Sequence, residues 1–259
     1  MSRRNATSFD HLLLLDRPHR NVAMDRLTLG PTLITRAYDA ILAAICDGRL
    51  PPGTRLKQDQ LADRLHVSRQ PVGQAVSILK SQGFLRDSGR RKLIVPPVER
   101  EFFSAIYHLR EALDPMAARL AAQHCTKEDS AVGRRLLSAG RRAARARVIE
   151  RVILADVHFH AWIYQLAGNP LLAETMGLYW CHLRRGMGEV LRQVAIRGQI
   201  WDEHQGIFES IAERDGGEAA RQSLVHVRDA AERIVESIPM APRGPGRSAA
   251  GTGFTGRRK

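Results

Sequence analysis

The sequence predicts a mainly α-helical protein in which a small N-terminal domain of three helices and a β-hairpin is followed by an all-α antiparallel helical bundle. Two observations support this fold class. Apolar residues recur at helical spacing over most of the segment from residue 33 to residue 238. Strand-like runs occur only between residues 84 and 95, around a turn that contains glycine.

Composition divides the chain into four parts. Residues 1–30 show no sustained apolar period and are expected to form a flexible arm. Residues 31–98 and residues 99–238 are the two predicted domains. Residues 239–259 are rich in proline, glycine and arginine, so they cannot bury a core and are expected to be a disordered basic tail.

The first domain is predicted to contain three helices in succession. Apolar side chains of residues 33–45 share one helical face, and the Asp-Gly pair at 47–48 ends that helix. A second, short helix is expected over residues 58–65. Ser68 is a suitable N-cap for a third helix, which is expected to end near Gly83.

A β-hairpin is predicted after the third helix. Residues 84–86 and 92–95 are expected to form two short strands, joined by a turn that carries Gly89, Arg90 and Arg91. Three helices and a basic hairpin make a winged helix, and its second and third helices have the layout of a helix-turn-helix. This winged helix-turn-helix would place the N-terminal end of its third helix in the major groove of DNA.

The expected DNA contacts fall into two classes. Side chains at the start of the third helix can reach base edges, namely Arg69, Gln70 and Gln74. The hydroxyl of Ser68 can cap the helix or bond a phosphate. The other basic side chains are expected to contact phosphates or the minor groove: Arg55, Lys57, Arg64, Arg90, Arg91 and Lys92. An ordinary amphipathic helix pair with solvated arginines is the alternative.

The charge distribution favours a nucleic-acid partner. The chain carries a net charge of +13, and residues 31–98 hold 11 lysines and arginines against 5 acidic residues, whereas residues 99–238 hold 19 of each. A basic domain joined to a neutral body is typical of a DNA-binding domain attached to a ligand-binding or dimerisation domain. The three cysteines suggest no disulfide framework, and no apolar run approaches the ~20 residues that span a bilayer. We therefore expect a cytoplasmic protein with no membrane partner.

The second domain shows three stripes at helical spacing, which predict long helices. The first holds Leu109, Leu113, Met116 and Leu120. The second holds Val152, Asp156, Phe159, His160 and Ile163, and the third holds Ile200, His204, Ile207 and Ile211. Two of these otherwise apolar faces therefore carry ionisable side chains.

Ionisable side chains on an apolar face are costly to bury unless something binds them. Asp156 and His160 share one helical face, His204 lies on another helix, and His226 follows on the last helix. One carboxylate oxygen and three imidazole nitrogens suit a divalent metal ion such as zinc, nickel or manganese. For each histidine taken singly, a hydrogen-bonded core or surface residue is the alternative.

Several segments resemble one known family. Residues 47–56 (DGRLPPGTRL), 67–72 (VSRQPV) and 79–85 (LKSQGFL) closely resemble the DNA-binding domain of the GntR family of bacterial regulators. The helical region after them resembles the ligand-binding domain, called FCD, of the FadR-like branch of that family. The resemblance covers about residues 33–238 and implies a winged helix-turn-helix followed by an FCD-type bundle.

The resemblance also implies particular ligands. In FCD domains the metal ligands are an aspartate, a histidine four residues later and two histidines on the following helices, and their positions correspond to Asp156, His160, His204 and His226. The resemblance further implies that Arg110 binds the carboxylate of an effector, a small organic or sugar acid. An internal salt bridge from Arg110 to an acidic residue of the bundle is the alternative.

One position departs from the family pattern. The family usually has an operator-contacting arginine directly after the Pro-Val pair, where this chain has Gly73. Glycine also lowers helix propensity by about 1 kcal/mol relative to alanine. We therefore expect an operator that differs from the usual half-site of the family.

Residues and resemblance together predict a transcription regulator and not an enzyme. We expect a homodimer on a roughly palindromic double-stranded DNA operator, because one winged helix contacts only a few base pairs. Operator binding is expected to respond to the effector at the metal site. Two alternatives stay open, a metal-dependent hydrolase with an accessory DNA-binding domain and an effector-independent architectural DNA-binding protein. The sequence has no HExxH motif or nucleophile elbow to favour the hydrolase.

Overall fold

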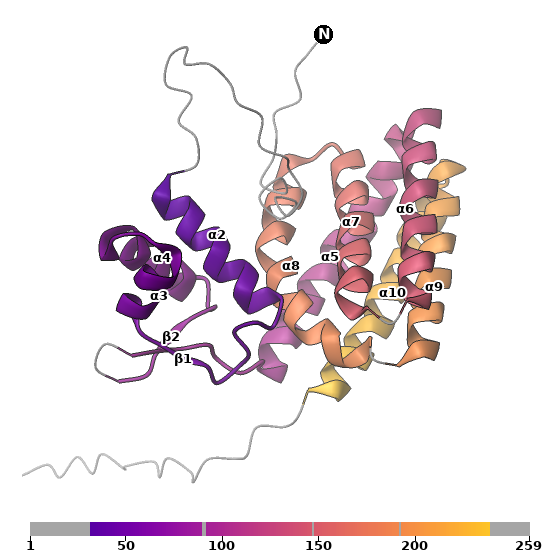
Figure 1. The fold of residues 1–259 in the computed structure, drawn as a ribbon. Helices are drawn as coiled ribbons and strands as arrows, with labels where there is room; N and C mark the ends of the chain where they lie inside the picture. The colour runs from indigo at the N-terminus through magenta and orange to yellow at the C-terminus, as the bar shows by residue number, and fades with distance from the viewer. Residues whose placement is uncertain (1–31, 90–91, 147, 192, 239–259) are drawn as a thin grey trace, which may run out of the picture.

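The computed structural model describes residues 32–89, 92–146, 148–191 and 193–238. The predicted N-terminal arm and basic tail lie outside the described residues, as do Arg90 and Arg91 at the tip of the predicted hairpin. The N-terminal domain and the helical bundle lie side by side, with α2 and α8 at their boundary (Figure 1).

The N-terminal domain is a winged helix. Its helices and strands are α2 (Leu33–Cys46), β1 (Arg55–Leu56), α3 (Gln58–Leu65), α4 (Arg69–Ser81), β2 (Arg86–Asp87) and β3 (Leu93–Ile94). The strands form an antiparallel sheet in the order β1-β3-β2, so β3 pairs with both of the others. Apolar side chains of all three helices and of β3 make one core, which includes Ile41, Val76, Leu79, Phe84 and Leu93.

The sequence interpretation missed β1 and placed the hairpin strands imperfectly. The second strand is Arg86–Asp87, two residues later than the predicted start, because Phe84 and Leu85 still belong to the turn that follows α4. The strand β1 has only two residues, too few to show alternation. It exists because the chain beside it pairs with distant residues: Gly53 donates to the carbonyl of Val95, and Val95 donates to that of Thr54.

The C-terminal domain is an all-α bundle. Its helices are α5 (Arg100–His124), α6 (Lys127–Arg145), α7 (Ile149–Leu166), α8 (Pro170–Val190), α9 (Val194–Ala212) and α10 (Gly216–Ser237). The helix α5 packs along α10, and α6 packs against α7 and α9 on the side of the bundle away from the winged helix (Figure 1). The run Gly168-Asn169-Pro170 is a sequence signal for the end of one helix and the start of the next, and α7 does end before Gly168, which has φ of +70°, while α8 begins at Pro170.

One predicted stripe lies at the edge of the core and not at its centre. The side chains of Leu109, Leu113 and Leu120 are only partly buried, and Met116 is 40% exposed. The buried face of α5 is offset from them and consists of Phe103, Ile106, Tyr107, Arg110, Asp114, Ala117, Ala118, Ala121 and Ala122. Small alanines let α10 approach α5 closely, and Leu113 and Leu120 pack at the edge of this contact. The other two stripes are buried as predicted.

The two domains meet through α8. The guanidinium of Arg184 forms an ion pair with Asp47 at 2.5 Å, and Arg185 donates to the carbonyl of Pro96 at 2.6 Å. The ring of His182 stacks on Phe84 with 3.9 Å between ring centroids. The winged helix is therefore held against one helix of the bundle.

The described part of the chain contains no helix with the length and apolar character that a membrane span requires.

Gly140→Ala is expected to destabilise the protein by about 1–3 kcal/mol, because a Cβ at this position of α6 would overlap the buried Trp201 ring of α9. Gly198→Ala in α9 is the matched control, since nothing lies within 4 Å of its added Cβ. The control is expected to be neutral or slightly stabilising. Urea unfolding followed by circular dichroism measures both. Equal unfolding midpoints for Gly140→Ala and the parent would contradict this packing.

Candidate functional site

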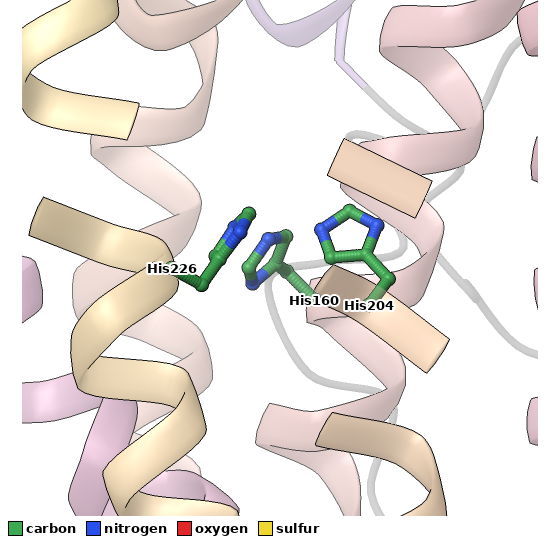
Figure 2. Close-up of side chains that lie close together, drawn as sticks. All are labelled: His160, His204 and His226. Carbon is green, nitrogen blue, oxygen red and sulfur yellow. The ribbon is translucent and has the colours of Figure 1, made fainter. Parts of the chain in front are cut away.

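Three histidines from three helices converge inside the bundle. His160 lies on α7, His204 on α9 and His226 on α10, and their rings point toward one another (Figure 2). One ring nitrogen of each lies within 4.8 Å of one from each of the others. All three side chains are buried. The sequence prediction that these histidines share a site is thus matched by their placement.

Asp156 joins this cluster one turn before His160. Its Oδ1 lies 3.4 Å from Nε2 of His204. Burial raises the pKa of its carboxyl to about 6, although His226 and Arg110 act in the opposite direction. A nearby positive charge stabilises the ionised form of a carboxyl group that is enclosed in this way. His158, on the same helix, does not belong to the histidine cluster.

His204 is the least satisfied side chain of the cluster. It is fully buried, and neither of its ring nitrogens has a hydrogen-bond partner among the described residues. Its Asp156 neighbour is within ion-pair distance but not in hydrogen-bond geometry. Burial lowers the pKa of His204 and of His160 well below 6.5, so both rings are neutral at pH 7. Neutral imidazoles have the lone pairs that a metal ion requires.

His226 is oriented by a second layer of residues that the sequence interpretation missed. Its Nδ1 lies 2.8 Å from Oε2 of Glu203, and Arg233 bonds the same carboxylate at 2.6 Å. Burial raises the pKa of Glu203, but the hydrogen bonds from His226 and Arg233 outweigh it and lower the pKa. With Nδ1–H donating to Glu203, Nε2 is free to bind a metal. Arg233 lies two turns after His226, a spacing that could have revealed it.

Arg110 is buried and forms the internal salt bridge that the sequence left as an alternative. Its guanidinium contacts Oδ2 of Asp114 at 2.9 Å, and Tyr164 donates to the other oxygen of that carboxylate at 2.6 Å. The guanidinium also lies 3.5 Å from Nε2 of His160 and over the faces of Tyr107 and Trp180. Arg110 therefore contacts both Asp114, its ion-pair partner, and the histidine cluster.

A small cavity of about 30 Å³ opens beside this cluster. Four polar residues line it, namely Arg110, Asp156, His226 and Arg233, and most of the other lining residues are apolar side chains of α8, α9 and α10. This volume has room for one or two water-sized groups. Its two arginines favour an anionic group, with Asp156 as the one acidic residue of the lining.

The donor set fits a divalent metal ion. It offers three imidazoles and one carboxylate, which is a ligand set typical of borderline divalent ions. The orphaned nitrogens of His204 are the observation that supports the fit, because buried polar atoms in proteins are nearly always bonded.

The side chains predicted to contact DNA lie on the surface of the winged helix. Those described are all exposed: Arg55, Lys57, Arg64, Ser68, Arg69, Gln70, Gln74 and Lys92. Ser68 precedes α4 in extended conformation and makes no capping hydrogen bond with its side chain, which leaves its hydroxyl available. The predicted contacts Arg90 and Arg91 lie outside the described residues.

Two details concern α4, the helix predicted to contact base edges. The side chain of Arg69 is 75% exposed and forms an ion pair with Asp59 at 2.9 Å, which an incoming base must replace. At Gly73, an added Cβ would meet only ordinary van der Waals contact, 3.6 Å from Oε1 of Gln58. The fold would therefore accept the arginine that the family usually has there.

Two family models match the chain. The model described as bacterial regulatory proteins, gntR family, matches residues 33–93, and the FCD domain model matches residues 105–229. The first match covers α2 to β3, and the second covers most of the helical bundle.

Known proteins of similar sequence are transcriptional regulators. The Nta operon transcriptional regulator of Aminobacter aminovorans is 28% identical over 192 residues, which cover 72% of this chain and 87% of that protein. The HTH-type transcriptional regulator McbR of Escherichia coli is 29% identical over 160 residues, which cover 61% of this chain and 72% of that protein.

Solved structures share this fold. The structure of E. coli McbR/YncC has a TM-score of 0.70 and 22% identity, and the match covers 79% of this chain and 98% of that chain. A putative transcriptional regulator GntR from Rhodococcus sp. RHA1 has a TM-score of 0.66 and 21% identity, with the same coverage of both chains.

His204→Leu is expected to raise the free energy of unfolding of the metal-free protein by about 1–2 kcal/mol, because it removes buried nitrogens that lack partners. His226→Leu is the matched control and is expected to destabilise, since it discards the hydrogen bond to Glu203. Urea unfolding after chelator treatment compares them. Added zinc should stabilise the parent and neither variant. Destabilisation by His204→Leu without metal would show that this histidine is satisfied by another group.

Proposed function

Because this chain is a transcription regulator of the GntR family with an FCD domain, we propose that its operator binding is modulated by a small carboxylate-containing effector at a metal site in the bundle. The observation that carries the proposal is the buried imidazole of His204, which lies among His160, His226 and Asp156 and has no hydrogen-bond partner in the described part of the chain. Such a cluster costs stability unless a ligand occupies it.

We propose that zinc, nickel or manganese occupies this cluster, held by Asp156, His160, His204 and His226. A bound ion would supply a positive charge and positions for an anionic ligand. Glu203 supports this role because it orients His226, as second-layer carboxylates orient metal-binding histidines.

The proposed effector is a small organic or sugar acid. Its carboxylate would contact the metal and the guanidinium of Arg110, in a cavity that Arg233 also lines. Arg110 suits this role because its ion pair with Asp114 and the flanking rings of Tyr107 and Trp180 fix its position. A preorganised guanidinium fork binds a carboxylate with little loss of side-chain entropy.

The helix α8 supports coupling between this site and the DNA-binding domain. Trp180 packs on His160, with 4.9 Å between ring centroids, and on Arg110. The residues directly after it contact the winged helix, since the Cys181 carbonyl meets Cys46 and His182 meets Gln82 at 3.0 Å. A ligand that shifts Trp180 would therefore displace the groups that hold the DNA-binding domain.

For operator binding we propose a homodimer that presents two winged helices to two half-sites. Arg69, Gln70 and Gln74 would contact bases, and Arg55, Lys57, Arg64, Ser68, Arg90, Arg91 and Lys92 would contact the backbone. The relatives reported above are regulators, which favours this function over a metal-dependent hydrolase. An architectural protein would bind DNA without responding to any small acid.

Arg69→Ala is expected to reduce discrimination between operator and random DNA by about 1–3 kcal/mol, because it removes a base contact. Lys92→Ala is the matched control, since loss of a phosphate contact weakens both kinds of DNA and lowers the salt slope by about 1. Fluorescence anisotropy at several salt concentrations, with an operator selected from genomic fragments, measures both. An unchanged operator preference in Arg69→Ala would place the recognition surface elsewhere.

Arg110→Lys is expected to keep the metal and to weaken binding of the acid by about tenfold, because lysine retains the charge beside Asp114 but lacks the guanidinium fork. An Arg110→Ala variant would leave the buried carboxylate of Asp114 without its ion-pair partner, so a loss of stability could not be separated from a loss of acid binding. Calorimetry with a panel of small organic and sugar acids, alongside metal analysis, tests this function. No response of operator binding to any of these acids would favour the architectural protein.

Metal occupancy is expected to fall as the pH drops below about 6. The carboxyl of Asp156 takes up a proton first, because burial raises its pKa to about 6. Burial lowers the pKa of His160 and of His204, so these imidazoles resist protonation until the pH is lower. Metal content after gel filtration at a series of pH values measures the change. Full retention at about pH 4 would contradict this ligand set.

A further inference from the structure

Two of the three cysteines meet where the DNA-binding domain packs against the bundle. Cys46 is the last residue of α2, and Cys181 lies within α8. The thiol of Cys46 donates to the carbonyl oxygen of Cys181, with 3.5 Å between sulfur and oxygen. Both are free thiols and buried. Two cysteines on facing helices thus meet at the boundary between the domains.

The surroundings of Cys181 favour its thiolate. Its hydrogen bond with Cys46 lowers its pKa, and the guanidinium of Arg184 adds to this effect against burial, Asp47 and Asp39. The pKa of Cys46 is correspondingly raised, first by that hydrogen bond and then by burial. Thiolate character beside a second thiol is the arrangement that oxidation requires.

We propose that Cys46 and Cys181 form a reversible disulfide when the protein meets a peroxide, and that this bond locks the DNA-binding domain against α8. The pair differs from Cys125, whose sulfur lies beside the hydroxyl of Ser130 within the bundle and has no second cysteine near it among the described residues. The thiols of Cys46 and Cys181 are not among the metal ligands or DNA contacts proposed above.

The proposed reaction needs one peroxide. The thiolate of Cys181 attacks a peroxide oxygen, the O–O bond breaks, and the departing hydroxide takes up a proton as water. Cys181 is then a sulfenic acid. The sulfur of Cys46 attacks the sulfenic sulfur, the S–O bond breaks, and the hydroxyl group leaves with the thiol proton as a second water. The two sulfurs lose two electrons in total, and the peroxide gains them.

The fold makes this bond both feasible and consequential. The sulfur of Cys46 already bonds the backbone of Cys181 on the adjacent helix, so a side-chain rotation and a short approach would bring the two sulfurs to the S–S length of about 2.05 Å. The ion pair of Arg184 with Asp47 lies beside them, and its transient opening would admit a small oxidant. Once closed, the disulfide would hold α2 against α8 and remove the freedom of the winged helix to adjust its orientation.

Formation of the bond can be tested without DNA or effector. The full chain is treated with hydrogen peroxide, unfolded, alkylated and digested, and peptides are identified by mass spectrometry. We expect a linked peptide containing Cys46 and Cys181 in the parent and in Cys125→Ser, and its disappearance after dithiothreitol. Cys46→Ser and Cys181→Ser should lack it. Alkylation of both thiols in the peroxide-treated parent would overturn the proposal.

The effect on DNA rests on the proposed function, so it is measured separately. We expect oxidation to change operator affinity by at least about fivefold in the parent and in Cys125→Ser. Dithiothreitol should reverse this change, and Cys46→Ser should not show it. A linked peptide with unchanged affinity would refute the lock. If the reduced protein bound no operator at all, the proposed function would fail while the peptide result stood.

Discussion

The cost of enclosing ionisable side chains in an apolar bundle is the constraint on which the C-terminal domain depends. Asp156, three histidines and the pair of Arg110 with Asp114 are all nearly inaccessible to water. For most of these groups, hydrogen bonds inside the domain offset the free-energy cost of desolvation. Glu203 bonds His226, and Tyr164 bonds Asp114. His204 has no such partner among the described residues, so the stability of the cluster depends on what binds there.

The helix α8 connects this cluster to the winged helix. Successive residues of a helix point in directions about 100° apart. Trp180 therefore faces Arg110 and His160, while Cys181 and His182 face the winged helix. The same turn of helix serves the buried site and the domain boundary, and no flexible segment separates the two functions.

Sequence reasoning succeeded where local pattern decides structure. The helix over residues 58–65 and the break before Pro170 follow from periodicity and capping. The histidines could be grouped because the family resemblance supplied their spacing. Glu203 and the partners of Arg110 could not be found, because their contacts depend on how helices distant in sequence are packed. The inward face of α5 was misplaced for a related reason: the close approach of α10 favours alanine over leucine at the contact.

The size of the cavity limits how an effector could enter. About 30 Å³ beside His226 and Arg110 is far less than the roughly 300 Å³ or more of a typical small-molecule pocket. Much of the remaining wall is made by Met187, Val190 and Leu191, at the end of the same helix that contacts the DNA-binding domain. A carboxylate alone could lie between Arg110 and the metal ligands, which line the same cavity, but the rest of the acid must push these side chains outward. Under the proposed function, binding therefore cannot occur without strain on α8, and a helix cannot shift at one end while its other contacts stay unchanged.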